Sequence, residues 1–313
     1  MKIENLVERL LKGEMLAAAR LISLVENTDQ NEKIVKLITP YLGKAYVIGI
    51  TGAPGVGKST LTDKLVRDLR KERKKIGVIA VDPTSPFSGG AILGDRIRLQ
   101  KLATDDGVFI RSMASRGHLG GISSATSDAI KILDAYGCDY IFIETVGVGQ
   151  SEIEVMKNVD STLLVLIPGM GDEIQAIKAG VMEIADIFVV NKADKDGVER
   201  IMLEIEMLQN LGESKQRLAP ISKVIAKDNI GIKGLLSEIQ KHKHYLIEND
   251  QFESNRKKRL ELEMKQIAHD KLLQRASNVL KENYDLHKLI EDVYEKKVDV
   301  YSVVNNLLAK IVK

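Results

Sequence analysis

The sequence predicts an α/β fold in which a mostly parallel sheet is flanked by helices on both faces. Between residues 45 and 245, apolar runs suited to strands alternate with amphipathic helical patterns. Polar motifs follow the ends of these runs, where parallel sheets bind their ligands. Such alternation requires crossover connections, and these place helices on both faces of the sheet. The expected strands cover residues 45–51, 77–82, 108–112, 140–146, 162–168, 187–191 and 221–226.

The 313 residues divide into an N-terminal helical segment (1–44), a central α/β domain (45–245) and a C-terminal helical arm (246–313). Apolar residues of the first segment recur at helical spacing, and we expect them to pack on the central domain rather than on a partner. The arm lacks Gly and Pro, and its apolar residues from Leu260 onward predict a long amphipathic helix. We expect this arm to form a homodimer; the alternative is that it folds back onto the sheet.

The composition argues against several classes of protein. With a net charge of +2, nothing requires a nucleic acid or an acidic membrane as partner, and the basic cluster at 256–259 fits a solvated helix face. The single cysteine, Cys138, can form neither an internal disulfide nor a Cys-x-x-Cys metal site. No apolar run approaches the roughly 20 residues that cross a bilayer. Because Glu4 and Glu8 also argue against a secretory signal, we expect a cytoplasmic protein.

The first expected strand leads directly into a Gly-x-x-x-x-Gly-Lys-Ser motif, and a helical pattern follows. This is the P-loop spacing in its strand–loop–helix context. Its glycines allow several N–H groups to face one phosphate chain, while Lys58 would reach the β- and γ-phosphates and Ser59 would ligate Mg²⁺. The alternative, a Gly-rich turn without a ligand, does not account for the Lys-Ser pair. The expected nucleotide-binding residues of this loop are Gly52, Ala53, Pro54, Gly55, Val56, Gly57, Lys58, Ser59 and Thr60.

A second motif, Asn191-Lys192-Ala193-Asp194, follows the expected strand at 187–191. The Asp194 carboxylate can accept hydrogen bonds from N1–H and the 2-amino group of guanine, whereas adenine has neither donor. A carboxylate left unpaired against adenine is strong discrimination. We expect Asn191 to brace the loops and the Lys192 stem to lie along the base. The sequence therefore predicts that the nucleotide is GTP or GDP.

A further base contact is expected from Ile225, Ala226 and Lys227, after the last expected strand. Many GTPases place Ser-Ala there, and the alanine N–H donates to guanine O6. The backbone donor is retained at Ala226, but isoleucine stands where the serine would be.

Glu144 lies near the end of the expected strand at 140–146, and Gly147 follows this strand directly. GTPases carry Asp-x-x-Gly at this place. The carboxylate would lie near Mg²⁺ and the glycine N–H would sense the γ-phosphate. Valine occupies position 148, where Ras-like enzymes place a glutamine that orients the attacking water. We therefore expect slow intrinsic hydrolysis.

Two further carboxylates are candidates for the Mg²⁺ and water region. Asp82 closes the second expected strand, and Asp95 ends a Gly-rich stretch that is typical of a switch segment. The alternatives are structural: Asp82 could cap an Asp-Pro turn, and Asp95 could be the N-cap of the helix that follows.

On these residues the chain resembles the MeaB/ArgK group of P-loop GTPases, which includes the human methylmalonic aciduria type A protein. The resemblance extends over the whole central domain, and glutamate at position 144 is normal in this group. The matching stretches are 52–60, 82–86, 89–96, 116–121, 144–152, 168–178 and 191–194.

The resemblance implies a chaperone for an adenosylcobalamin-dependent acyl-CoA mutase, chiefly methylmalonyl-CoA mutase. GTP binding and slow hydrolysis would gate cofactor loading and protect the mutase, with an adenosyltransferase as a further partner. The resemblance also implies a homodimer held by the C-terminal arm. It further implies that Asp95 and Lys178 become catalytic when the mutase binds, with Lys178 carried on a third switch at 169–178. Without the resemblance, Lys178 would be interpreted as a solvated helical lysine.

Three other functions are compatible with parts of the pattern. A nickel-delivery GTPase has a similar fold, but it needs Cys/His clusters, whereas His242 and His244 face different sides of a helix. A kinase linked to transport of basic amino acids would need a kinase catalytic loop, which the sequence does not supply. A nucleotide-dependent scaffold with incidental hydrolysis is the third.

Overall fold

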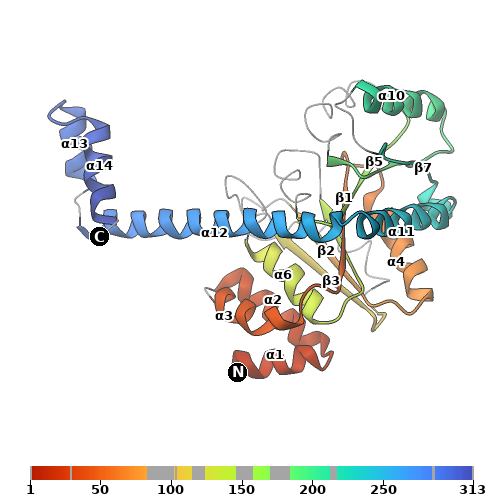
Figure 1. The fold of residues 1–313 in the computed structure, drawn as a ribbon, viewed down its shortest axis with the longest axis horizontal. Coiled ribbons are helices and arrows are strands. Elements are labelled where there is room, and N and C mark those ends of the chain that lie inside the picture. Colours follow the sequence, from red (N-terminus) through yellow and green to blue (C-terminus); the bar gives the residue numbers. More distant parts are fainter. Residues whose placement is uncertain are drawn as a thin grey trace. The chain divides into compact units, whose positions relative to one another are not determined.

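The computed structural model describes residues 2–28, 30–82, 102, 104–114, 124–145, 158–169, 184–211, 217–283 and 286–311. The chain forms two compact units, Met1–Phe252 and Glu253–Lys313. The first unit contains the N-terminal helices and the whole sheet (Figure 1).

A seven-stranded parallel sheet organises the first unit, in the order β3-β2-β4-β1-β5-β6-β7. All the expected strands are present, and each differs from its expected range by one to three residues at one or both ends, so the predicted α/β class is confirmed. Their bounds are β1 Tyr46–Thr51, β2 Ile76–Asp82, β3 Val108–Ala114, β4 Tyr140–Thr145, β5 Ser161–Leu166, β6 Ile187–Val190 and β7 Ile221–Lys223.

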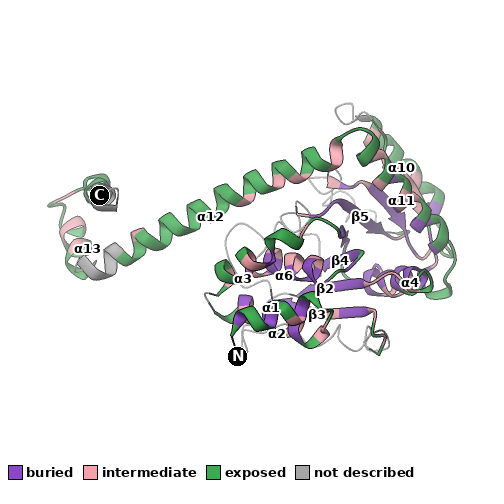
Figure 2. Ribbon diagram, turned by 60° about the horizontal axis from the view of Figure 1, so that its bottom comes forward, coloured by how far each residue is buried: buried purple, intermediate pink, exposed green. Residues whose placement is uncertain are grey.

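The helices of the first unit cover both faces of this sheet (Figure 1). Because both faces are covered, the central strands β1, β4 and β5 are buried along their whole length and have nearly continuous apolar sequences. Figure 2 shows this burial for β4 and β5. The helix bounds in this unit are α1 Ile3–Leu11, α2 Met15–Asn27, α3 Asn31–Ile38, α4 Lys58–Lys71, α6 Ser124–Ala135, α10 Val198–Leu211 and α11 Ile232–Glu248, with 3₁₀ turns η1 Thr39–Tyr41 and η2 Ala226–Asp228.

Two separate hydrophobic cores lie on the two faces. One packs α4, α10 and α11 against side chains such as Ile48 and Phe142. The other packs α1, α2, α3 and α6 against side chains such as Val47 and Ile141. Neighbouring residues of a strand enter different cores because side chains alternate between the faces. The N-terminal helices thus pack on the sheet, as their apolar spacing predicts, and Arg111 of β3 joins them through an ion pair with Glu26.

Aspartates fix the amino ends of the strands in register. Asp160, just before β5, accepts a 2.9 Å hydrogen bond from the Val47 N–H, while its own N–H donates 2.7 Å to the Val47 carbonyl. Asp186, just before β6, makes the same reciprocal pair with Thr162. Asp139, before β4, makes it with Lys75.

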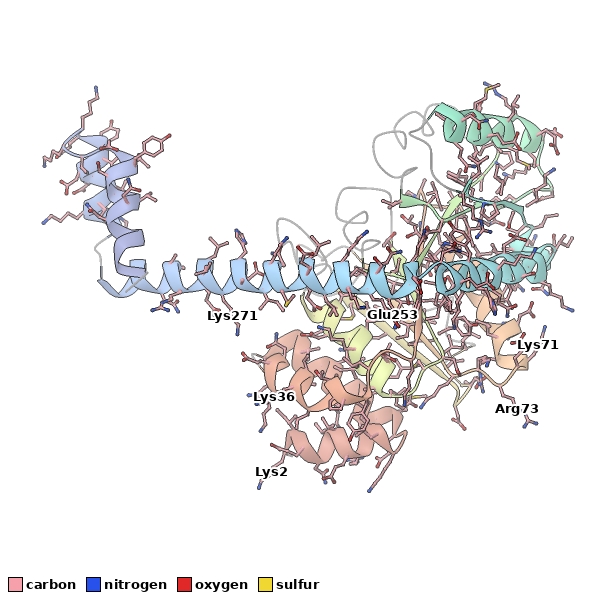
Figure 3. All side chains as sticks on the ribbon, in the orientation of Figure 1. Lys2, Lys36, Lys71, Arg73, Glu253 and Lys271 are labelled. Carbon is pink, nitrogen blue, oxygen red and sulfur yellow. The ribbon has the colours of Figure 1, made fainter. Side chains whose placement is uncertain are left out.

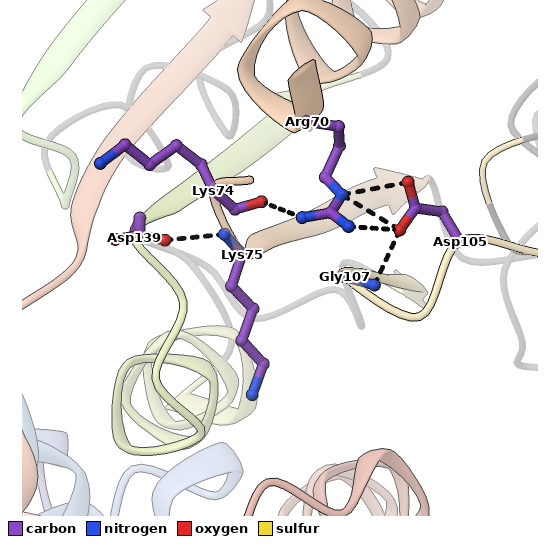
Figure 4. A network of polar contacts seen from close by, with 6 residues as sticks. All are labelled: Arg70, Lys74, Lys75, Asp105, Gly107 and Asp139. Carbon is purple, nitrogen blue, oxygen red and sulfur yellow. Dashed lines mark hydrogen bonds and ion pairs between the residues drawn. The ribbon is translucent and has the colours of Figure 1, made fainter. Parts of the chain in front are cut away.

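Charged side chains also join the end of α4 to the loops that precede β2 and β3 (Figure 4). Arg70, at the end of α4, makes a bidentate ion pair with Asp105 at 2.7–3.0 Å and donates 2.6 Å to the Lys74 carbonyl. The Gly107 N–H donates to the same carboxylate at 2.8 Å. A β-carbon on Gly107 would lie 2.0 Å from the Arg70 guanidinium, so a larger residue here would displace the Arg70 side chain from this position.

A buried polar chain joins β1, β5 and α11 at the same end of the sheet. The Tyr46 hydroxyl lies 2.5 Å from Ser161 Oγ, which lies 2.7 Å from His242 Nδ1. Burial, followed by the Arg217 charge, lowers the pKa of His242 to about 4. Phe252 stacks on the Tyr46 ring at 6.1 Å and covers this chain. These groups are therefore held in one arrangement by their packing.

The second unit is helical. Its long helix α12 (Gln251–Asn283) begins at the end of the first unit, and α13 (Leu286–Tyr294) and α14 (Val300–Ile311) follow. Side chains such as Lys271 extend into solvent from α12 (Figure 3). Apolar side chains on α12 are also largely exposed: Leu260, Leu262, Met264, Ile267, Leu272 and Leu273.

Candidate nucleotide site

The central position of β1 brings three motifs to one edge of the sheet. β1 pairs with β4 on one side and with β5 on the other, and β6 lies beyond β5. The Gly-rich loop follows β1, Glu144 is the second-last residue of β4, and Asn191 follows β6. Because all these strands are parallel, their carboxyl ends share this edge, the usual ligand position in such sheets.

Two glycines allow the loop to pass close to its neighbours. Gly52 has φ +150°, and a β-carbon there would lie 2.3 Å from the Val165 carbonyl oxygen. Gly57 has φ +97°, and a β-carbon there would lie 2.5 Å from the Asn191 amide nitrogen. Side chains are excluded at both positions, so the loop backbone is the lining that a ligand would meet.

Lys58 begins α4 directly after this loop, and the α4 N-terminus has no side-chain cap. Its ammonium group donates to the carbonyls of Gly52 at 2.7 Å and Ala53 at 3.0 Å. The Lys58 side chain is buried, so its charge is held beside the loop backbone. A cation and an uncapped helix N-terminus at one loop form a suitable environment for phosphate.

Ser59 and Glu144, both expected to hold Mg²⁺, lie next to each other. Ser59 Oγ donates to Glu144 Oε1 at 2.5 Å, and both residues are only 5% exposed. A hydroxyl and a carboxylate are hard oxygen ligands of the kind that Mg²⁺ prefers. Their pairing fits an Mg²⁺ site completed by phosphate oxygens and water. Thr62, which belongs to no motif, also donates to Glu144, at 3.3 Å.

Asn191 joins the two loops that flank the site. Its amide nitrogen donates to the Val56 carbonyl at 2.8 Å, and its amide oxygen accepts from the Ala226 N–H at 3.1 Å. Asn191 is 3% exposed, so neither bond competes with bulk water. Asn191 therefore ties the phosphate-side loop to the loop expected to face the base.

The next residues of the motif are more open. Lys192 has φ +55°, a left-handed conformation that is uncommon outside glycine, and its ammonium group donates to the Gly55 carbonyl at 2.9 Å. Asp194 is exposed, so its carboxylate is accessible to a ligand. Left-handed backbone at a ligand-facing turn is a common feature of functional sites.

The loop after β7 is closed by a short antiparallel bridge between Ile225 and Ile230. Ala226 is buried, whereas Lys227 is exposed. Because the Ala226 N–H donates to Asn191, a contact from this N–H to guanine would require that bond to be shared or exchanged. The expected base contact at Ala226 thus competes with the brace between the loops.

Four expected site residues cannot be placed at side-chain level. Asp82 is the last residue of β2, at the same edge of the sheet, but its side chain lies outside the described part of the structure. Asp95, Gly147 and Lys178 lie entirely outside the described residues.

Comparison with known proteins identifies the family of this chain. A family model described as "Methylmalonyl Co-A mutase-associated GTPase MeaB" matches residues 18–281. The chain belongs to the MeaB family. A relative in Pyrococcus abyssi, named as a GTPase, is 49% identical to this MeaB-family chain and covers 99% of it, and the match includes 97% of the relative.

Two further similarities extend the comparison. The mouse mitochondrial methylmalonic aciduria type A homolog is 32% identical over 87% of this chain and 70% of its own length. A crystal structure titled LAO/AO transport system kinase covers 99% of this chain and 98% of its own, with a TM-score of 0.73 and 25% identity. The MeaB-family chain is thus a P-loop GTPase in family and in fold. Among the residues that the structure describes, no helix combines the length and apolar character that a membrane crossing requires.

Proposed function

We propose that this chain binds GTP with Mg²⁺ and hydrolyses it slowly until a partner binds. The brace at Asn191 carries the nucleotide part of the proposal, because it joins the phosphate-side loop to the base-side loop. On binding, phosphate oxygens would replace the carbonyls of Gly52 and Ala53 as partners of the Lys58 ammonium group. Ser59 and Glu144 would hold Mg²⁺, which would neutralise charge on the phosphates.

Guanine selectivity is assigned to Asp194. In Asp194→Asn, an amide replaces one carboxylate oxygen by a donor, so the two donors of guanine lose an acceptor while the 2-oxo group of xanthine gains a partner. We expect GDP affinity to fall by roughly 100-fold and xanthosine diphosphate binding to appear. Competition with a fluorescent GDP analogue measures both. Unchanged preference for guanine would contradict the assignment; Asp196→Asn, another exposed aspartate in the same segment, is the control.

We further propose that the client is an adenosylcobalamin-dependent acyl-CoA mutase, most specifically methylmalonyl-CoA mutase. The family description names association with this mutase, and the mouse relative carries the name of a methylmalonic aciduria protein. The chain would act as a chaperone that gates adenosylcobalamin loading and protects the mutase from inactivation. An adenosyltransferase is the proposed source of the cofactor.

The switch residues Asp95 and Lys178 would act only in this complex. Their proposed roles come from the family resemblance, with Lys178 delivered to the γ-phosphate in the way an arginine finger acts. Asp82 and Gly147 would complete the Mg²⁺ and γ-phosphate contacts.

The deciding experiment is GTP turnover by the purified protein, alone and with methylmalonyl-CoA mutase. We expect slow turnover alone, at least tenfold stimulation by the mutase, and loss of stimulation in Lys178→Ala. Lys36→Ala, an exposed lysine of α3 (Figure 3), is the matched control and should retain stimulation. If no acyl-CoA mutase stimulates turnover while GTP still binds, the partner is wrong and the nucleotide assignment stands.

The homodimer is proposed from the exposed apolar side chains of α12. Leu260, Met264 and Ile267 recur at three- and four-residue spacing and are 45–65% exposed, a pattern suited to a helical interface. We propose that a second copy of this chain packs against these apolar side chains. Light scattering should give twice the chain mass for the wild type, and Met264→Glu with Ile267→Glu should shift the mass toward the monomer.

A further inference from the structure

Thr62 contacts the carboxylate that we assign to the Mg²⁺ site, although it lies beyond the Gly-Lys-Ser motif. Thr62 Oγ1 lies 3.3 Å from Glu144 Oε2, while Ser59 Oγ donates to Oε1 at 2.5 Å. The two hydroxyls therefore contact the two oxygens of one carboxylate. Thr62 is 0% exposed, so water does not compete for this contact.

Helix geometry explains why these two hydroxyls meet one carboxylate. Residues three apart on a helix lie on the same face, and Ser59 and Thr62 occupy the first turns of α4. That face is turned toward the end of β4, where Glu144 is 5% exposed. The carboxylate is thus held between α4 and the sheet.

The Thr62 hydroxyl has one proton and two acceptors. Oγ1 also lies 3.0 Å from the Lys58 carbonyl, the usual partner of a threonine inside a helix. A hydrogen bond to a carboxylate is charge-assisted and stronger than one to a neutral carbonyl. The proton is therefore available to Glu144 while the carbonyl serves as the alternative acceptor.

A glutamate at this position needs more restraint than an aspartate, because its extra methylene adds a rotatable bond. We propose that Thr62 is a positioning residue that fixes the Glu144 carboxylate in the orientation required for Mg²⁺. This inference rests on the proposed GTP and Mg²⁺ binding. Thr62 itself would not be a metal ligand; its contact with Oε2 would leave Oε1 and the Ser59 hydroxyl as the groups that hold Mg²⁺.

The simpler explanation is that Thr62 only satisfies its own buried hydroxyl through Lys58. In that case its removal would affect folding and leave Mg²⁺ dependence unchanged. The two explanations are separated by measuring nucleotide binding as a function of Mg²⁺ concentration.

The test uses the full chain and a fluorescent GDP analogue. GDP affinity is measured in EDTA and across a Mg²⁺ titration for wild type, Thr62→Val and Thr62→Ser. Valine keeps the shape and removes the hydroxyl, whereas serine keeps the hydroxyl. In Thr62→Val we expect the midpoint Mg²⁺ concentration to rise by about tenfold, the effect of losing one charge-assisted hydrogen bond, with affinity in EDTA unchanged. Thr62→Ser should stay within about twofold of the wild type.

Each result distinguishes this inference from the proposed function. If Mg²⁺ strengthens GDP binding equally in wild type and Thr62→Val, the positioning role is wrong and the proposed function stands. If Mg²⁺ has no effect on the wild type, the proposed metal site is wrong. Equal loss of affinity in EDTA and in Mg²⁺ would show a role in loop structure and overturn the inference. If Thr62→Val does not fold, Thr62→Ala replaces it, with Thr62→Ser as the rescue.

Discussion

The amino ends and the carboxyl ends of the parallel strands carry similar polar residues and use them differently. At the amino ends, Asp139, Asp160 and Asp186 each exchange hydrogen bonds with the backbone of the neighbouring strand. At the carboxyl ends, Lys58 contacts loop carbonyls and Glu144 contacts hydroxyl groups. The first set fixes strand register, and we propose that the second exchanges these partners for a ligand.

In such a sheet, residue type alone does not determine whether a polar side chain stabilises the fold or binds a ligand. An aspartate between two strand starts accepts from a fixed backbone N–H group, so it stabilises the fold. A lysine beside a Gly-rich loop has partners that phosphate oxygens can replace. Position relative to the strand direction therefore predicts which substitutions change stability and which change binding.

The largest expected effect is on nucleotide affinity, and it should differ between Lys58 at the carboxyl ends of the strands and Lys75 at the amino ends. Lys58→Ala should lower GTP affinity by roughly 1000-fold, about 4 kcal/mol, because a buried charge paired with phosphate is lost. The free energy of unfolding without nucleotide should change by less than about 1 kcal/mol, since the cost of burying the charge is also removed. Isothermal calorimetry and urea unfolding measure the two quantities.

The matched control lies at the other end of the sheet. Lys75 donates 2.7 Å to the Tyr136 carbonyl and sits 3.2 Å over the Tyr136 ring, and burial lowers its pKa. Lys75→Ala should cost about 1 kcal/mol of stability and leave GTP affinity unchanged. Loss of GTP affinity in this variant would break the division between the two ends.

The next effect is pH dependence at the amino end. Because the pKa of His242 is lowered from 6.5 to about 4, the unfolded chain binds a proton more readily than the folded chain. Stability should therefore fall as pH drops from about 6.5 toward 4, by about 3 kcal/mol in total. Asp186, 3.8 Å from the ring, opposes this shift, while burial and Arg217 favour it.

Substitution isolates this contribution from the carboxylates that titrate in the same range. In His242→Asn, an amide can still meet Ser161 but does not titrate, so unfolding free energy should fall less steeply between pH 6.5 and 4 than in the wild type. Urea unfolding at several pH values gives both slopes. Equal slopes would show that His242 does not contribute. GTP affinity at pH 7.5 should be the same in both proteins.

The smallest expected effect concerns Asn191, which does not follow the division between the two ends of the strands. Asn191 lies at the carboxyl end, yet its two hydrogen bonds join protein backbone to protein backbone. Asn191→Ala leaves a buried N–H and a buried carbonyl unpaired, so both stability and GTP affinity should fall, each by about 1–2 kcal/mol. Gln209→Ala is the control, since Gln209 makes a similar amide bridge to Ala219 away from the motifs. Loss of affinity with unchanged stability would show that Asn191 acts on the nucleotide alone.

Much of the fold could be predicted because its signals are local in sequence. The β1 strand, the Gly-rich loop and the start of α4 are consecutive, so spacing alone identifies them. Continuous apolar runs identified the strands because both faces of the sheet are covered. The 3₁₀ turn at Ala226–Asp228 shortens the last strand to Ile221–Lys223, which no apolar pattern signals.

The contacts that sequence could not predict join distant residues. Tyr46, Ser161 and His242 lie on three elements, and only tertiary packing brings them together. Thr62 is predictable in principle from its place three residues after Ser59, but its partner Glu144 is not local. The break between α11 and α12 falls at Asn249 and Asp250, and Asp250 adopts the left-handed conformation. Because neither residue is Gly or Pro, the sequence contains no clear signal for this break.

The two hydrophobic cores on opposite faces of the sheet have a consequence for mutational tolerance. Among the residues that the structure describes, the core of the N-terminal helices, with Leu21 and Ile34 fully buried, shares no side chain with the core beneath α4. Energetic coupling between substitutions is small when they are well separated and share no partners. The sheet thus separates the core beneath α4, the helix that carries Lys58 and Thr62, from the core beneath the N-terminal helices. The N-terminal helices could therefore change in sequence, or be redesigned to bind another protein, without compensating substitutions in the loop beside Lys58.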